Sequence, residues 1–573
     1  MKIDPTSSAR PFLAWTLIAL LSSARIAGAE PAAAGAGQPA GGLGAVEGAA
    51  PSATPGITTT GTNPGTSGSE AAPEAPKHKK KAKAPAPPPL PVLDVAPAEP
   101  ATLTRTLEPL VLRAGVALPG WLGSEIGSIR AYALVNGKLQ PVPFQVDERA
   151  ADGRYLYPDG IRNDAVEIDG KLTAEDELVL LASDAGARPP DGTLVPGAAD
   201  TQLVAIEDPA PPRPPAITPP PPAPPAPAPG DAASTTPAAP APPAPPPPPP
   251  PSQPTGPTHG WFVLARYDGA PPDRSLVTQP RMVHEWDKNY VYSSSYGIGF
   301  YDFVPPAHSA VPREIRLRQA DGAGPNILDR FKWRVEISVL WGLYTVRFDE
   351  QNVRVQVLAY KIGPVRTLRY VACRVVLPFG IDGPSLTIDA AFYPTMAQIP
   401  LELTVPHSPG FIGTHSDLIL GVDLSPNAQG MLFYDSENPD GFLVDGWMSE
   451  TEKAQRKRPD QWRLWAGKQG SLVERTFWDP AYLKTVGLEV EYVDDAADQR
   501  PPEEKPGQHG AYFERYRVDD LAPGTYRALM EWYFPGWYEY TPGDESAVLA
   551  VRDQPLRVRV GDWEGPALPP PPR

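Results

Sequence analysis

The sequence predicts an all-β protein: a large antiparallel β-sandwich or supersandwich with a smaller N-terminal β-subdomain and long disordered segments rich in Pro, Ala and Gly. Three observations lead to this fold class. Apolar and polar residues alternate with a period of two through residues 331–405. Only short turn sequences separate the alternating runs, and helical patterns are scarce.

The alternation is clearest in residues 334–341, where Val335, Ile337 and Val339 are separated by charged or hydroxyl side chains. This is the period of a strand with one face buried and the other in water. Further runs alternate in the same way at residues 353–357, 386–392 and 399–405. Because the connections are short, we expect mostly antiparallel pairing.

Another apolar run changes phase part-way along its length. Leu368 and Tyr370 share one parity, whereas Val371 and Cys373 share the other. A β-bulge shifts a strand by one residue, so the sequence predicts a bulge between Arg369 and Val371. Cys373 is the only cysteine and lies at an apolar position, which predicts a buried, unreactive thiol and no intrachain disulfide.

Composition divides the chain into folded and disordered parts. Its 573 residues include 80 Pro and 50 Gly, but also 13 Trp, 21 Tyr and 15 Phe. Pro/Ala/Gly tracts bury too little apolar surface to offset chain entropy, so the aromatic residues must be concentrated in folded segments. The expected organisation is a signal peptide (1–29), a disordered Ala/Gly/Pro spacer with a basic run (30–101), an N-terminal β-subdomain (102–208), a Pro-rich disordered insertion or linker (209–258), the main β-sandwich domain (259–563) and a Pro-rich tail (564–573).

The N-terminus has the pattern of a secretory signal. Lys2 and Arg10 precede an apolar run at residues 11–21, and Ala27 and Ala29 are the small residues of a cleavage site. The apolar run is too short to span a bilayer. We therefore expect a secreted, periplasmic or cell-surface protein with no membrane span after signal cleavage.

Net charge limits the partners that the chain can have. The formal net charge of -16 argues against nucleic acid or an anionic membrane surface as a global partner. A local basic run at residues 77–83 is either a solvated cluster or a contact for anionic envelope polymers.

Short strands are expected in the N-terminal subdomain at residues 107–116, 129–135, 142–146, 177–182 and 201–207. Asn136-Gly137 is a strong signal for a type I′ turn between the second and third of these. The octapeptide 141–148 is the most distinctive sequence in the chain, and its prolines suit an edge strand. Asp147 and Glu148 are adjacent and point to opposite faces, so we assign them no shared chemistry.

A Pro-rich tract at residues 209–257 separates two strand-like segments, 202–207 and 261–266. One interpretation is a linker between two independent domains. We prefer another, in which the two segments pair as one hairpin and the tract is inserted at its tip. Closure entropy grows only logarithmically with loop length, so such an insertion costs little.

No motif in the sequence specifies a reaction. The serine-hydrolase elbow, the zinc HExxH motif, the P-loop and CxxC are all absent. The seven histidines never stand two or four residues apart, so we expect no metal site, and we expect no cofactor. The carboxylate pair of a glycosidase has no sequence spacing, so the sequence assigns no catalytic residue and does not decide whether the protein is an enzyme.

The strongest functional signal is aromatic. Tyr290, Tyr292 and Tyr296 share parity, which predicts a row of rings on one face of a strand. Sugar rings present apolar faces that stack on such rows, and Trp286 and Asp287 are candidates for an edge wall and a hydrogen-bond acceptor. These five residues are the candidate ligand-binding residues. The alternative is that the rings fill the sandwich core.

A corner sequence, Gly363-Pro364-Val365-Arg366, lies between two strand patterns and is followed by long antiparallel runs. This arrangement resembles secreted carbohydrate-active proteins of the galactose-mutarotase-like β-supersandwich type, in which a GPVR corner recurs. The resemblance covers residues 261–534 at most. It implies polysaccharide lyases, epimerases or non-catalytic sugar-binding relatives, and the chain lacks the helical toroid that many of the lyases carry.

The function expected from these features is that of a secreted or periplasmic protein that binds envelope or extracellular carbohydrate. One alternative is a polysaccharide lyase or glycoside hydrolase. The other is a non-catalytic structural protein of the cell envelope.

Overall fold

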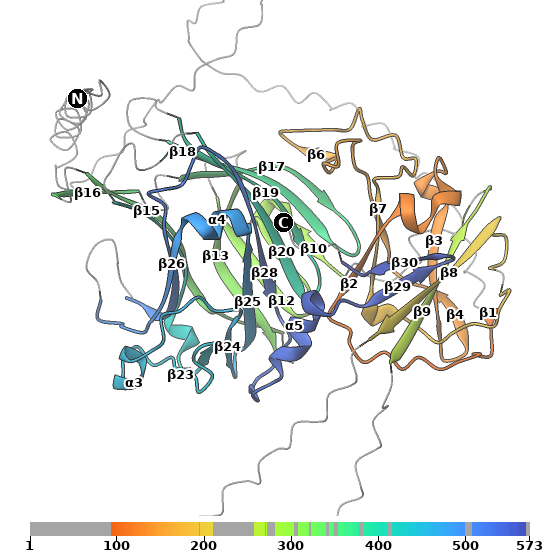
Figure 1. The fold of residues 1–573 in the computed structure, drawn as a ribbon. Helices are drawn as coiled ribbons and strands as arrows, with labels where there is room; N and C mark the ends of the chain where they lie inside the picture. Colours follow the sequence, from red (N-terminus) through yellow and green to blue (C-terminus); the bar gives the residue numbers. More distant parts are fainter. Residues whose placement is uncertain are drawn as a thin grey trace, which may run out of the picture. The chain divides into compact units, whose positions relative to one another are not determined.

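The computed structural model describes residues 93–193, 195–209, 257–269, 271, 281–302, 308–319, 322–339, 343–348, 353–376, 382–406, 408, 415–498 and 507–568. The predicted signal peptide, the basic run at 77–83 and most of the Pro-rich tract lie outside these ranges. Within them, antiparallel strands form four sheets, which confirms the predicted all-β class (Figure 1).

Two of the sheets contain the N-terminal strands. The first has 7 strands in the order β1 (Leu93–Asp94), β4 (Lys138–Pro141), β3 (Ile129–Val135), β9 (Thr258–Arg266), β8 (Asp200–Asp208), β29 (Arg557–Val560) and β30 (Trp563–Pro566). The second has 3 strands in the order β2 (Pro109–Arg113), β7 (Glu177–Leu181) and β5 (Gln145–Asp147).

The other two sheets form the larger part of the fold. The 15-stranded sheet has the order β10 (Val283–Glu285), β11 (Tyr290–Tyr292), β12 (Tyr296–Asp302), β13 (His308–Gln319), β17 (Val353–Ile362), β18 (Thr367–Val376), β19 (Asp382–Phe392), β20 (Met396–Val405), β28 (Gly524–Tyr533), β25 (Gly470–Trp478), β24 (Arg463–Gly467), β22 (Leu432–Asp435) and β23 (Phe442–Leu443), with β14 (Gly322–Asn326) on β13 and β6 (Asp159–Gly160) on β17. The 5-stranded sheet has the order β16 (Tyr344–Phe348), β15 (Leu328–Val339), β21 (His415–Leu424), β27 (His509–Arg517) and β26 (Gly487–Val493).

Helices are short in the part of the chain that the structure describes. They are α2 (Ala114–Ala117), α3 (Glu450–Lys453), α4 (Pro480–Thr485) and α5 (Glu545–Asp553). None of these helices is long and apolar enough to cross a membrane.

The sheets pack face to face, and each interface has its own apolar core. Trp532 of β28 and Tyr512 of β27 belong to the core between the 15-stranded and 5-stranded sheets. On the other face of the 15-stranded sheet, Leu368 shares a core with Val179 of β7. Leu180 of β7 instead faces the 7-stranded sheet. Because β7 is buried on both faces, its sequence is an almost continuous apolar run.

The predicted hairpin around the Pro-rich tract is confirmed. Strands β8 and β9 pair antiparallel in one unbroken register, from Asp200 with Arg266 to Asp208 with Thr258. The predicted boundary between 102–208 and 259–563 must therefore be corrected, because β9 lies between β3 and β8 in the 7-stranded sheet. Strands β29 and β30 extend the same sheet and cover the edge of β8, so the C-terminal strands also belong with the N-terminal subdomain (Figure 1).

Replacing residues 209–257 by Asn-Gly is expected to leave a single cooperative unfolding transition. A two-residue type I′ turn matches the twist of paired strands, and Asp208 and Thr258 already stand opposite each other. Urea unfolding followed by fluorescence and by circular dichroism tests this, because the two signals should change together. Purification of two separately folded fragments, 93–208 and 258–573, would contradict the hairpin.

Two local predictions need correction. Asn136 and Gly137 have φ values of 51° and 72°, as a type I′ turn requires, but the strand that follows is β4 and not 142–146. The predicted bulge lies on the partner strand: Val357 pairs with Val371 and Ala359 with Tyr370, so that β17 carries the extra residue. 

The phase change in β18 has a different cause, which is that both faces of this strand are covered. Leu368 packs in the core shared with β7, whereas Val371 and Cys373 pack on the opposite face. Cys373 is buried as predicted, and burial raises the pKa of its thiol to about 12. The thiol is therefore protonated at neutral pH and unreactive.

Candidate functional site

The structure separates the five candidate ligand-binding residues. Tyr290 and Tyr292 lie on β11 and point outward from the 15-stranded sheet, whereas Val291 between them is fully buried in the core. Tyr296 lies on β12 and is also fully buried, with its ring stacked on Phe534 at 3.8 Å. Sequence parity does not carry from β11 to β12, because the chain reverses between the two strands.

Trp286 and Asp287 lie in the short 3-10 turn that joins β10 to β11. The ring of Trp286 stacks on Tyr360 at 3.9 Å and meets His308 edge-on at 4.2 Å. Trp286 therefore packs against β13 and β17 and does not form a wall beside the tyrosine pair. Asp287 is exposed in the turn.

Tyr290 and Tyr292 stand in two rows of cross-strand neighbours on the outer face of the sheet. The rows are Glu285, Tyr290, Gly299 and Glu314, and Val283, Tyr292, Gly297 and Arg316. We call Glu285, Tyr290, Tyr292, Glu314 and Arg316 the tyrosine surface.

Glycine on β12 lets the aromatic rings lie close to the sheet. A Cβ on Gly297 would stand 2.0 Å from Tyr290 Oη, so only glycine fits beneath that side chain. The two tyrosine rings lie 5.6 Å apart, with an angle of 40° between their planes, and both are partly exposed. The result is a low aromatic platform over β11 and β12.

Charged groups stand on both sides of this platform. On β13, Arg316 contacts Glu314 at 3.1 Å and donates to the Gly324 carbonyl. On β10, Glu285 pairs with Lys288 at 2.6 Å. These charged residues are not among the candidate residues expected from the sequence. Two features of the sequence could have identified them. Charged residues alternate with apolar ones along 314–318, and glycines stand two apart in 297–299; together these patterns indicate a solvent-facing strand surface next to an aromatic pair.

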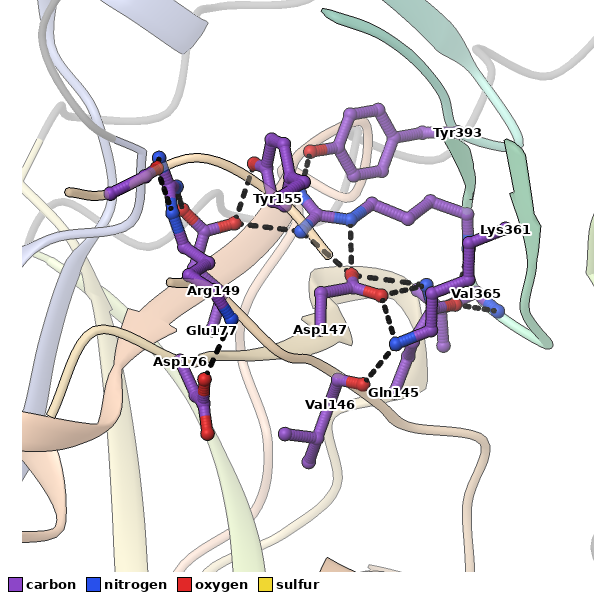
Figure 2. Close-up of polar contacts among 12 residues, drawn as sticks. Gln145, Val146, Asp147, Arg149, Tyr155, Asp176, Glu177, Lys361, Val365 and Tyr393 are labelled. Atoms are coloured by element: carbon purple, nitrogen blue, oxygen red, sulfur yellow. Dashed lines mark hydrogen bonds and ion pairs between the residues drawn. The ribbon is translucent and has the colours of Figure 1, made fainter. Parts of the chain in front are cut away.

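A second cluster brings together the two most distinctive sequences of the chain, the octapeptide 141–148 and the corner Gly363-Pro364-Val365-Arg366 (Figure 2). The Gln145 side chain accepts hydrogen bonds from the backbone N–H groups of Val365 and Arg366 at 3.3 and 3.1 Å. A Cβ on Gly363 would stand 1.9 Å from Gln145 Oε1. The corner glycine is thus required by the close approach of β5.

Arg366 is the centre of this cluster. Its guanidinium donates to Asp147, to Glu177 and to the Tyr393 hydroxyl, each at 2.7 Å. It is 1% exposed. Figure 2 shows that Asp147, Glu177 and Tyr393 converge on this guanidinium; Asp147 and Glu177 belong to β5 and β7, and Tyr393 follows β19.

Each carboxylate of the cluster has a second cation. Lys361 lies 2.9 Å from Asp147, and Arg149 pairs with Glu177. Burial raises the pKa of Asp147, but Lys361 and Arg366 outweigh burial and lower it to about 2. Burial likewise raises the pKa of Glu177, and Arg366 and Arg149 outweigh it, so that this pKa is also lowered.

The lowered pKa values of Asp147 and Glu177 indicate that the cluster stabilises the fold. Carboxylates with lowered folded-state pKa values stabilise the fold above pH of about 4, and this stability is lost as the pH falls toward about 2. A general acid needs the opposite shift. We therefore interpret the Arg366 cluster as a structural tie between the N-terminal subdomain and β17–β19.

A third cluster surrounds Arg463 and has more acids than bases. The guanidinium is shared by Glu514 at 2.8 Å and by Glu474 and Asp460, each at 3.2 Å. Burial and the neighbouring carboxylates raise the pKa of Asp460 to about 7. Arg463 itself is only 2% exposed, so this cluster also lies inside the fold. Among the described residues, no group of three or more His, Cys, Asp or Glu side chains could hold a metal ion.

Comparisons with known proteins give little further information. No protein-family model matches the chain, and no curated protein matches it. Among solved structures, the chain is similar to a heparinase III, with a TM-score of 0.24 and 7% identity over 50% of this chain and 42% of that one. The alignment thus spans less than half of the heparinase chain, and a similarity at this level does not bear on activity.

Proposed function

We propose that the tyrosine surface binds a carbohydrate polymer and that the protein acts as an exported carbohydrate-binding protein. The observation that supports this proposal is the tyrosine pair on the outer face of the sheet, with ring centroids 5.6 Å apart. The Tyr290 side chain lies over Gly297, and both tyrosines are partly exposed on this face.

The chemistry of the surface suits a saccharide. Sugar rings have apolar C–H faces, and tyrosine offers a large apolar area at a small cost in side-chain entropy. The rim of a sugar ring carries hydroxyl groups, for which Glu285 and Glu314 provide acceptors and Arg316 provides donors. Strands β10 to β13 span roughly 14 Å at the usual strand spacing, which is long enough for more than one sugar ring.

Replacing Tyr290 and Tyr292 together by alanine is expected to weaken retention on an insoluble polysaccharide by roughly 5- to 160-fold. Each ring contributes about 0.5–1.5 kcal/mol through stacking. The measurement is a binding isotherm of the full chain against a panel of insoluble polysaccharides. Tyr538→Ala is the matched control, because Tyr538 is 47% exposed and lies outside the tyrosine surface.

Thermal unfolding separates a loss of binding from a loss of fold. Partly exposed tyrosines are expected to cost less than about 1 kcal/mol when they are truncated. A loss of about 3 kcal/mol per residue would mean that the pair is core packing and would contradict the proposal. Release of reducing ends by the wild-type chain would instead identify a polysaccharide lyase or glycoside hydrolase.

A further inference from the structure

A cavity of about 120 Å³ lies between the 15-stranded and 5-stranded sheets. Leu401 of β20 and Met530 of β28 line one side, and Trp333 of β15 and Leu418 of β21 line the other. Among the described residues that line it, Arg369 is the one that carries a charge. The guanidinium of Arg369 lies over the Phe300 ring at 4.1 Å and donates to Asn289 Oδ1 at 2.7 Å.

This lining does not suit water. A buried water molecule needs two to four polar partners and about 15 Å³, so a cavity of about 120 Å³ could hold roughly eight water-sized groups. Aliphatic and aromatic walls offer almost no hydrogen bonds for so many waters. Apolar cavities of about 150 Å³ stay dry and take up small hydrocarbons.

The lining extends both along and across the strands: it runs along β19, and it crosses the 15-stranded sheet from β12 to β25. Leu386, Ile388, Ala390 and Phe392 all line the cavity from successive inward positions of β19. Six steps along a strand cover about 20 Å. A volume of about 120 Å³ is small for so extended a lining, so the space is narrow, which matches one slender flexible chain better than a compact ring system.

We propose that this cavity is a binding site for a single unbranched alkyl chain, such as the chain of a free fatty acid or fatty alcohol. The chain lies between the two sheets and is held by apolar contact alone. This site is separate from the tyrosine surface, because Tyr290 and Tyr292 point to the opposite face of the sheet from Val291 and the core.

Calorimetry and native mass spectrometry of the full chain with straight-chain alcohols from hexanol to hexadecanol test the proposal. The expected result is saturable binding of one alcohol per chain, with an optimum length beyond which affinity stops rising. Absence of saturable binding by the wild type, or capture of diacyl phospholipid from vesicles without binding of any free alcohol, would overturn the single-chain site.

Two lining variants with opposite effects on the cavity sharpen the test. Ala390→Leu adds volume to the lining and is expected to lower the affinity for the optimum alcohol about tenfold or more. Each methylene group that no longer fits into the cavity lowers the affinity about fourfold. Leu401→Ala enlarges the cavity and is expected to shift the optimum to a longer chain. Leu432→Ala is the control, because Leu432 is 38% exposed on β22 and does not line the cavity. Equal behaviour of all three variants, each confirmed as folded by circular dichroism, would overturn the proposal.

Discussion

Replacing Arg366 by alanine is expected to lower the free energy of unfolding by about 3–5 kcal/mol. The substitution leaves Asp147 and Glu177 buried without the guanidinium that they share, and an uncompensated buried charge is among the most costly defects in a fold. It also removes the hydrogen bond to the Tyr393 hydroxyl. Urea unfolding at neutral pH, followed by tryptophan fluorescence, measures the loss.

The matched control is Arg347→Ala. Arg347 also pairs with a carboxylate, Glu336 at 2.7 Å, but its side chain is 54% exposed. Exposed ion pairs contribute about 1 kcal/mol or less, so this variant should unfold close to the wild type. Similar losses for the two arginines would show that Arg366 does not tie the N-terminal subdomain to β17–β19.

Replacing Tyr296 by alanine is expected to cost about 3–5 kcal/mol, the usual range for emptying a large aromatic site in a core. Tyr296 is fully buried, stacks on Phe534, and donates its hydroxyl to the Tyr393 carbonyl at 2.8 Å. Thermal and urea unfolding measure the loss. Tyr290→Ala, made in the same way, should cost less than about 1 kcal/mol because its ring lies on the outer face.

Tyr296→Phe divides the cost of Tyr296→Ala into packing and hydrogen bonding. Phenylalanine keeps the stacked ring and leaves the Tyr393 carbonyl without this donor, so we expect a loss of about 1–2 kcal/mol. If Tyr296→Ala were as stable as Tyr290→Ala, the assignment of Tyr296 to the core would be contradicted.

The strands could be predicted because their signal is local. Alternation of Val335, Ile337 and Val339 follows directly from one buried and one wet face, and the structure places all three on β15. The hairpin of β8 and β9 could be predicted for a similar reason, since two strand-like segments flank the Pro-rich tract. The pairing of β29 with β8 could not, because no local pattern specifies which edge a distant strand will cover.

Burial on both faces misled the interpretation of β18. Leu368 and Val371 face different cores, so the change of phase looked like a bulge, although β18 keeps its register with β19 from Thr367 to Arg374. A strand that is covered by other sheets on both faces has no polar face, so the alternation of apolar and polar residues is lost.

The candidate site could be predicted only in part. The spacing of Tyr290 and Tyr292 on one strand predicts that they share a face, but it does not say which face. Tyr296 has the same parity in the sequence and lies in the core, because the chain reverses after Tyr292. Glu314 and Arg316 come from β13, which pairs with β12 in space. Cross-strand neighbours of this kind depend on register, and register is set by the whole sheet.

The most direct test of the proposed function is fluorine NMR of the chain labelled with 3-fluorotyrosine. The chain has 21 tyrosines, and Tyr290→Phe and Tyr292→Phe assign the two resonances of interest. Titration with an oligosaccharide of the retained polysaccharide is predicted to shift both resonances together, whereas the resonance of Tyr538, which is 47% exposed elsewhere on the surface, stays in place. Saturable binding of the oligosaccharide with no shift at Tyr290 or Tyr292 would contradict the proposal that the tyrosine surface is the binding site.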